Sequence, residues 1–310
     1  MKKQYIFNFV SKFKLANSIS LFLMVASIIL VLFKGLNFGI DFKGGTLMEL
    51  RVASDNVSIG DIRSSFSKLN LGDLNVKEFG KKGDYLIKFE MKEFNDQMNL
   101  KIIKETVTKN LNTEVNFRRI ENVGPKVSTE LLNSGILAIS LALGAMLFYI
   151  WIRFEWQFSL GSITAIFHDV LITLGIFSLL SLEVNLSIVA AVLTIVGYSM
   201  NDTVVIYDRI RENLSKFSSL NISEISNISI NETLSRTVIT SVTTLLALFS
   251  IFLLGGSILK GFAFAMIVGV IIGTYSSIYI ANPVLVYLKV NHNTIVKEEN
   301  KSNINSEPQP

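Results

Sequence analysis

Four ionisable side chains lie within or at the edge of long apolar stretches of the sequence: His168, Asp169, Asp202 and Arg236. An unpaired charge at the centre of a bilayer costs about 2.5 to 3.5 kcal/mol on insertion scales, so such residues usually face a bundle interior or water. Burial and a nearby cation act on a carboxylate in opposite directions, which suits a group that takes up and releases protons. The sequence therefore predicts proton exchange as the chemistry of this chain.

Asp202 lies in "VGYSMNDTVVIYDRI", residues 196 to 210, next to Asn201. Helical spacing places the hydroxyls of Tyr198 and Ser199 on the face of Asp202. Alternatively, Asn201 and Asp202 hydrogen-bond neighbouring helices, or the helix ends before them.

Arg236 follows "SINETLS" at the start of the fifth apolar stretch, from which it can reach back to pair with Asp202. The alternative is an arginine that extends to the lipid headgroups and fixes topology.

His168 and Asp169 lie in the middle of "TAIFHDVLITL" and rank second as proton-path residues, together with Asn201 and Ser199. Consecutive helical residues point about 100° apart, so we expect His168 and Asp169 not to form one ion pair facing one way. Helix packing or helix distortion is the other explanation for this pair.

The elements around these residues are predicted to be membrane helices. Half of the 310 residues are apolar, 17% are charged, and the mean hydropathy is +0.46, values that indicate a membrane protein. Runs of roughly 20 apolar residues are long enough to cross a bilayer core of about 30 Å. We predict six spans, at residues 16–34, 131–152, 158–181, 185–207, 237–254 and 261–288.

Lysines and arginines in the short loops predict the orientation of these spans. Lys2, Lys3, Lys12 and Lys14 precede the first span, which is interpreted as an uncleaved signal anchor. Residues 1–15 and both termini are expected to be cytoplasmic, as are a loop at 208–236 and a disordered tail at 289–310.

Residues 37–125 have the charge content of a soluble domain, and their pattern reads β-α-β-β-α-β. This order is typical of the ferredoxin-like fold. Ser58 and Asp61 resemble an N-terminal helix cap. The predicted fold is a six-helix membrane bundle with an inserted extracytoplasmic α+β ferredoxin-like domain.

Two further motifs concern packing. "GVIIG", Gly269 to Gly273, has the small-residue spacing that lets two helices approach closely, or it marks plain flexibility. Asn282 and Pro283 should bend or end the last span.

Several functions are excluded by composition. The chain has no cysteine, and His168 and His292 are too far apart for a short metal motif, so we expect no metal site and no cofactor. It has no GxxxxGK[ST] phosphate loop and no basic nucleic-acid footprint. No nucleophile is accompanied by a base and an orienting group, so an enzyme is not expected.

The chain resembles the SecF family, the smaller partners of SecD in the accessory complex of the bacterial Sec protein-export channel, within the RND superfamily of proton-driven export pumps. The resemblance covers nearly all of residues 15–290. It lies in "FGIDFKGGTLMEL", "ENVGPKVSTELL", "FHDV", "GYSMNDTVVIYDRIREN" and "NETLSRTVITSVTT".

This resemblance implies a subunit that couples proton flow to movement of the external domain and so promotes preprotein translocation. The aspartate of "NDT" and the arginine of "LSRT" belong to the family's proton path, here Asp202 and Arg236. Gly39, Asp41, Gly44 and Gly45 mark the hinge between membrane and external domain. The implied location is the bacterial inner membrane. The implied partners are a SecD-like six-span protein, the Sec channel (SecY, SecE, SecG), unfolded preprotein and membrane lipid.

Two other functions remain open. One is a proton-driven RND-type exporter of lipids or small hydrophobic molecules, which a large apolar pocket would favour. The other is a structural scaffold of the channel without proton coupling, in which neutral substitutions at Asp202 and Arg236 are tolerated.

Overall fold

The computed structural model describes residues 7–54, 57–69, 71–78, 82–89, 96–292 and 294. The chain divides into two compact units. Unit 1 comprises Met1–Asn37 and Ala138–Pro310, and unit 2 comprises Phe38–Leu137. Lys2, Lys3 and nearly all of the predicted tail beyond 292 lie outside the described residues.

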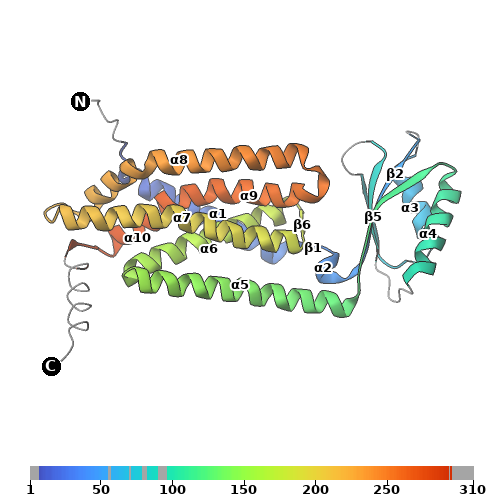
Figure 1. The fold of residues 1–310 in the computed structure, drawn as a ribbon, viewed down its shortest axis with the longest axis horizontal. Helices are drawn as coiled ribbons and strands as arrows, with labels where there is room; N and C mark the ends of the chain where they lie inside the picture. Colours follow the sequence, from blue (N-terminus) through green and yellow to red (C-terminus); the bar gives the residue numbers. More distant parts are fainter. Residues whose placement is uncertain are drawn as a thin grey trace, which may run out of the picture. The chain divides into compact units, whose positions relative to one another are not determined.

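Unit 1 is a bundle of long helices that run side by side (Figure 1). They are α1 (Phe13–Phe33, preceded by the 3₁₀ turn η1, Val10–Lys12), α5 (Pro125–Arg153, of which the part from Ala138 on belongs to unit 1), α6 (Trp156–Leu179), α7 (Leu186–Lys216), α8 (Ile222–Leu254) and α9 (Gly256–Ser276). A π-helix, η2 (Ser277–Ala281), and α10 (Asn282–Tyr287) continue α9. Six helical segments of the described chain are long and apolar enough to cross a membrane, which confirms the predicted multi-pass fold.

The helices differ in how much of their surface they bury. α6 and α7 have buried side chains along their whole length. Among those at most 1% exposed are Phe158, Ala165, Ile188 and Ile195. α1, α5 and α8 instead leave many large apolar side chains exposed. A helix that is apolar on all sides belongs in a membrane, so the exposed faces of these outer helices are suited to lipid or to a partner helix.

The segment 208–236 is not the loop that we predicted, since only residues 217–221 separate α7 from α8. Both helices continue because their charged side chains pair with one another. The Arg209 guanidinium donates to Glu232 at 2.6 Å and to Glu212 at 2.5 Å. Asn213 Nδ2 also donates to Glu232, at 2.8 Å, and so ties the two helices together.

Unit 2 is an α+β domain. Its strands are β2 (Gly45–Val52), β3 (Leu74–Glu78), β4 (Asp84–Phe89) and β5 (Val115–Val123), and its main helices are α3 (Ile59–Ser67) and α4 (Asp96–Leu111). The sheet order is β3-β4-β2-β5, and all three neighbouring pairs are antiparallel. This order and the β-α-β-β-α-β sequence confirm the ferredoxin-like prediction. Lys81 of the predicted turn and residues 93–95 of the predicted second helix lie outside the described residues.

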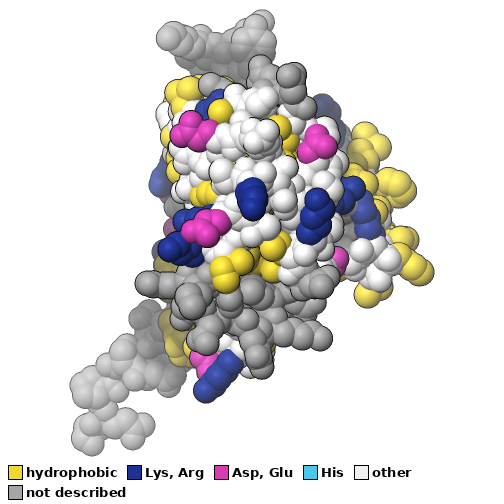
Figure 2. All heavy atoms as spheres, turned by 90° about the vertical axis from the view of Figure 1, so that its right-hand side faces the viewer, with side chains coloured by type: hydrophobic (Ala, Val, Ile, Leu, Met, Phe, Trp, Pro, Cys, Tyr) yellow, Lys and Arg dark blue, Asp and Glu magenta, His cyan; other side chains and the backbone are white. Residues whose placement is uncertain are grey.

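α3 and α4 cover the same face of this sheet (Figure 1). Ile62 and Phe66 from α3 and Val107 from α4 are fully buried there against Met48 and Ile87 of the strands. Unit 2 therefore has its own apolar core. On its surface, the face seen in Figure 2 shows basic and acidic side chains interspersed.

The predicted cap of α3 is present. The Asp61 carboxylate accepts from the Ser58 hydroxyl at 2.7 Å and from the Ser58 backbone N–H at 2.9 Å, while the Asp61 N–H donates back to the Ser58 hydroxyl. These bonds from Ser58 hold the pKa of Asp61 below its usual range.

Two short strands and one short helix complete the description. β1 (Asn37–Phe38) pairs with β6 (Glu183–Val184), which lies between α6 and α7. α2 (Ile40–Lys43) follows β1 and precedes β2.

Candidate functional site

A buried polar cluster of unit 1 surrounds the carboxylate of Asp169, which is 1% exposed. Its Oδ1 lies 2.8 Å from Nδ1 of His168. Its Oδ2 accepts from the hydroxyl of Ser199 on α7 at 2.5 Å and from that of Ser276 on α9 at 2.7 Å. One side chain on α6 thus holds three inner helices together.

The contact between His168 and Asp169 corrects our sequence prediction, which excluded an ion pair between them. The 100° between consecutive Cβ directions holds for the helix, but both side chains have rotatable bonds and bend toward each other. Both face the bundle interior, and His168 is also only 1% exposed.

Asp202, on α7 one turn after Ser199, is almost as buried, with 2% of its surface exposed. Its bonding is the reverse of that of Asp169. Oδ2 of Asp202 is buried and has no hydrogen-bond partner among the described residues. The Tyr198 hydroxyl on the same helix is likewise buried and unpaired within the described chain. A buried carboxylate without donors is costly in its charged form.

Arg236 is exposed on α8 and is not in direct contact with Asp202. No ion pair within 4.0 Å joins these two described side chains. Asn201 is also exposed, on the opposite side of α7 from the buried face. The structure thus brings Ser199, His168 and Asp169 together and keeps Asn201 and Arg236 outside that cluster.

Two glycines of α9 set its distance from α7. A Cβ added at Gly269 would lie 2.2 Å from Cγ1 of Ile195, and one added at Gly273 would lie 3.0 Å from Cβ of Ser199. Real side chains essentially never approach so closely. The predicted small-residue motif is therefore confirmed as a close helix contact, and it brings Ser276 within reach of Asp169.

The last span does not end at Asn282 and Pro283. The helix changes to π geometry over Ser277–Ala281 and then continues as α10. Proline cannot donate the backbone bond that an α-helix requires, and the wider π turn accommodates this. Asn282 Nδ2 donates to the carbonyl of Ser277 at 2.7 Å, and the Ser277 hydroxyl reaches the carbonyl of Ser199 at 3.2 Å.

Ser276, Ser277 and Thr203 belong to this polar centre, and our sequence prediction missed them. The Thr203 and Ser277 hydroxyls lie 2.9 Å apart, and both are buried. The available signal was "YSSIYIANP", in which two adjacent serines interrupt an apolar run just before a proline. Hydroxyls in such runs often bond to a neighbouring helix.

The predicted hinge residues lie around α2 and the start of β2. Gly44 and Gly45 have φ angles of +77° and +116°, a region that favours glycine. A Cβ on Gly44 would also lie 3.3 Å from the carbonyl of Val123. Gly39 has extended backbone and precedes α2, which contains Asp41.

We describe two of the hollows that the described residues of unit 1 line. One, of about 670 Å³, is an apolar groove between α1, α6 and α9 with η2, and we call it the α1 groove. It is lined mainly by leucine, isoleucine and alanine, together with His168, Tyr275, Tyr279 and Lys12. The size and composition are typical of small-molecule sites.

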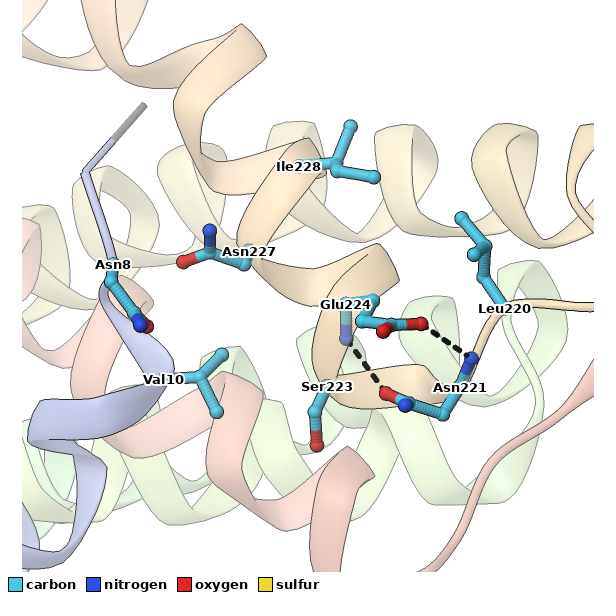
Figure 3. A pocket seen from close by; sticks show the side chains of 8 residues that line it. All are labelled: Asn8, Val10, Leu220, Asn221, Ser223, Glu224, Asn227 and Ile228. Atoms are coloured by element: carbon cyan, nitrogen blue, oxygen red, sulfur yellow. Dashed lines mark hydrogen bonds between the residues drawn. The ribbon is translucent and has the colours of Figure 1, made fainter. Parts of the chain in front are cut away.

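The other hollow, of about 420 Å³, lies between the first described residues and the start of α8 (Figure 3). Asn221 and Glu224 cap α8 reciprocally there. Asn227 accepts the backbone N–H of Phe9, and Asn231 exchanges two hydrogen bonds with the backbone of Phe7. These side chains are occupied in fastening the N-terminal segment to α8.

Among the described residues, no three His, Asp or Glu side chains gather as metal ligands.

Comparisons with known proteins place this geometry in a family. The model of the family described as "Protein export membrane protein SecD/SecF, C-terminal" matches residues 103–291, and the SecD/SecF GG motif matches residues 29–55. Protein translocase subunit SecF of Cereibacter sphaeroides is 43% identical over 87% of this chain and 86% of its own length. The SecF of Rickettsia bellii is 43% identical over 90% of this chain and 92% of its own.

Solved structures agree. The crystal structure of SecDF, a translocon-associated membrane protein from Thermus thermophilus, matches with a TM-score of 0.84 and 37% identity over 93% of this chain. A SecDF in a super-membrane-facing form matches with a TM-score of 0.68 and 36% identity over 95% of this chain. The present chain spans 40% of each of those SecDF chains. With its bundle, its inserted ferredoxin-like domain and matches along almost all of its length, the chain belongs to the SecD/SecF family of protein-export membrane proteins.

Proposed function

We propose that this chain is the SecF-type subunit of a SecD/SecF complex and couples proton flow through unit 1 to movement of unit 2, which promotes preprotein translocation. The observation that carries the proposal is Asp202, a carboxylate 2% exposed in a membrane helix with an unpaired buried oxygen. Such a group is stable in the bundle when neutral and needs a counter-charge when ionised.

Arg236 supplies that counter-charge in a second state. In the state described, Arg236 is exposed on α8 and Asp202 is buried on α7. Proton release leaves a negative charge that attracts the guanidinium, and proton uptake removes this attraction, so the two side chains define two states of the α7–α8 pair. One charge moved through 100 mV is worth about 2.3 kcal/mol, enough for a few protons to bias a two-state movement.

The remaining polar residues have supporting roles in this proposal. Ser199 links the Asp202 face of α7 to Asp169, and Asn201 is exposed on the same helix. Gly39, Asp41, Gly44 and Gly45 form the hinge through which unit 2 moves. The positive φ angles of Gly44 and Gly45 support a backbone role for both.

The assembly we propose contains a SecD-like six-span partner, the Sec channel (SecY, SecE, SecG), unfolded preprotein and surrounding lipid. The SecF names of the relatives and the SecDF match support the first of these. The chain lies in the bacterial inner membrane with both termini in the cytoplasm and unit 2 outside. Lys12, Lys14, Arg153 and Lys289 support this orientation through the positive-inside rule.

Asp202→Asn tests the proposal. In inverted membrane vesicles that contain the whole complex, the variant should assemble with its partner but lose the increase in preprotein export that a proton gradient gives to the wild type. Asp208→Asn is the matched control, since Asp208 is an exposed carboxylate on the same helix, paired with Arg153 at 3.1 Å. Full gradient-dependent export by the Asp202 variant would overturn the coupling mechanism.

A second candidate function is supported by the α1 groove. A large apolar pocket favours an RND-type exporter of lipids or small hydrophobic molecules. The α1 groove is such a hollow and has a volume of about 670 Å³. Ile172→Trp would fill the groove from α6. If the chain exports lipids, this variant should abolish lipid efflux from vesicles, whereas a protein-export subunit should retain its preprotein activity.

A further inference from the structure

His168 and Asp169 form a buried dyad whose hydrogen bonds indicate where its hydrogen atoms lie. Asp169 receives two serine hydroxyls on Oδ2, at 2.5 and 2.7 Å, and the imidazole Nδ1 on Oδ1, at 2.8 Å. An ionised carboxylate only accepts hydrogen bonds, so this set is fully satisfied when both serines and Nδ1 donate. In the neutral imidazole, Nε2 then carries the lone pair.

Nε2 of His168 has no hydrogen-bond partner in the described part of the chain, although the residue is 1% exposed. Its ring lines the α1 groove and stacks on Tyr275, with the ring centroids 6.1 Å apart. A buried polar atom without a partner is rare in folded proteins and needs an explanation. The imidazole lines the α1 groove, and we infer that a partner reaches Nε2 from that side.

We propose that the His168–Asp169 dyad is a second proton-binding site, separate from Asp202, which takes up a proton at Nε2 of His168 from the α1 groove. The proton adds to the Nε2 lone pair, no other bond breaks, and the net charge of the dyad changes from −1 to zero. The resulting imidazolium stays in contact with the carboxylate that neutralises it. The proposal deepens the proposed function and rests on it for the use to which that proton is put.

The titratable groups around the dyad are compatible with this role. The groove carries Tyr275 on α9, Tyr279 on η2 and Lys12 on η1. The Tyr275 hydroxyl lies 3.0 Å from that of Ser20 on α1 and donates to the carbonyl of Ala16 at 2.9 Å. Tyr275, Tyr279 and Lys12 are thus polar groups in the lining of a mainly apolar groove, and water needs such partners in order to enter a hollow.

On the α7 side, Ser199 faces the dyad, and Asp202 follows one turn later. Ser199 therefore connects the two carboxylates through one helix face. A proton at His168 changes the charge that α7 meets at Ser199, without any contact between His168 and Asp202.

Nuclear magnetic resonance of the imidazole nitrogens tests the proposal on the full chain in lipid nanodiscs. The sequence contains two histidines, so [15N]histidine labelling gives signals from His168 and His292 alone. His292→Gln removes the second set and is the matched control, since His292 lies far along the chain and contacts the carbonyl of Leu214 instead. We expect Nδ1 of His168 to carry hydrogen throughout and Nε2 to gain it as the sample is titrated from alkaline to acidic pH.

The tautomers of the neutral imidazole in Asp169→Asn provide a second measurement, one that a purely structural role of Asp169 would leave unchanged. Without the carboxylate, Nδ1 loses its fixed acceptor, so the neutral imidazole should show both tautomers where the wild type shows one. An Nε2 that keeps one state over this pH range, or hydrogen found on Nε2 and not on Nδ1 in the neutral form, would overturn the proposal.

The two proposals fail separately. A titrating Nε2 together with full export by Asp202→Asn would retain the dyad and remove the coupling mechanism. If Nε2 does not change its protonation state and Asp202→Asn loses gradient-dependent export, the coupling mechanism stands with Asp202 as its proton site and the dyad proposal is wrong.

Discussion

Asp169 and Asp202 are carboxylates of the same bundle, each at most 2% exposed, yet their surroundings differ. Asp169 accepts two hydroxyls and contacts an imidazole, whereas Oδ2 of Asp202 meets no donor among the described residues. Bonds of the first kind stabilise one charge state and hold three helices together. Their absence at Asp202 leaves its charge state free to follow the surroundings. Two equally buried carboxylates thus differ in how far their surroundings stabilise the charged form.

The largest effect that separates the two carboxylates is expected on folding. Asp169→Ala strands His168 Nδ1 and two serine hydroxyls in the bundle, so it should lower the free energy of unfolding by about 3 to 5 kcal/mol. Asp202→Ala removes no hydrogen bond to a described residue and should cost much less. Unfolding of both full-length variants in mixed micelles measures this, and equal losses would contradict the comparison.

A smaller effect tests whether the Asp169 cluster depends on the close approach of α7 and α9. Gly269→Ala pushes its new methyl into Ile195 and should cost about 1 to 3 kcal/mol, the usual range for overpacking. Gly144→Ala on α5 is the matched control, because its Cβ would meet no atom within 4 Å. If both variants are equally stable, the glycines do not set the helix distance.

The smallest effect concerns a third carboxylate, Asp61. Like Asp169 it accepts several hydrogen bonds, but it lies at the surface. Its folded pKa is lowered, so its contribution to stability is complete above the unfolded value of about 3.9 and is lost as the pH falls through the folded pKa. Protection of α3 amides from hydrogen exchange, corrected for intrinsic rates, should fall on acidification in the wild type.

Asp61→Asn should remove this acid-dependent step from α3, and Ser58→Ala should weaken the helix by about 0.5 to 2 kcal/mol at neutral pH. An unchanged acid response in Asp61→Asn would show that other groups control it. Either outcome separates the effect of hydrogen bonding from that of burial.

The sequence predicted local features well because their causes are local. Ser58 and Asp61 are three residues apart, and the alternation of strands in unit 2 follows from apolar spacing. It also placed Asp202 on a buried helix face. The contacts of Asp169 were out of reach, because Ser276 is 107 residues away along the chain. The pairing of His168 with Asp169 was missed for another reason, since helix geometry gives the directions of Cβ atoms and not the rotamers beyond them.

The lengths of α7 and α8 were also underestimated, because hydropathy marks where a helix leaves the membrane and not where it ends. Both helices continue past that point and are joined there by the ion pairs of Arg209 with Glu212 and Glu232.

The π-helix at Ser277–Ala281 gives the last membrane segment a property that a plain helix lacks. One extra residue is stored in its wide turn, directly after Ser276, the serine bonded to Asp169. If the extra residue moved along the helix, the helical segment on one side of it would rotate by about 100° and shift by about 1.5 Å along its axis, and the backbone hydrogen bonds would re-form. Such a shift on the Ser276 side would turn its hydroxyl away from Asp169 and break the hydrogen bond that joins α9 to α6.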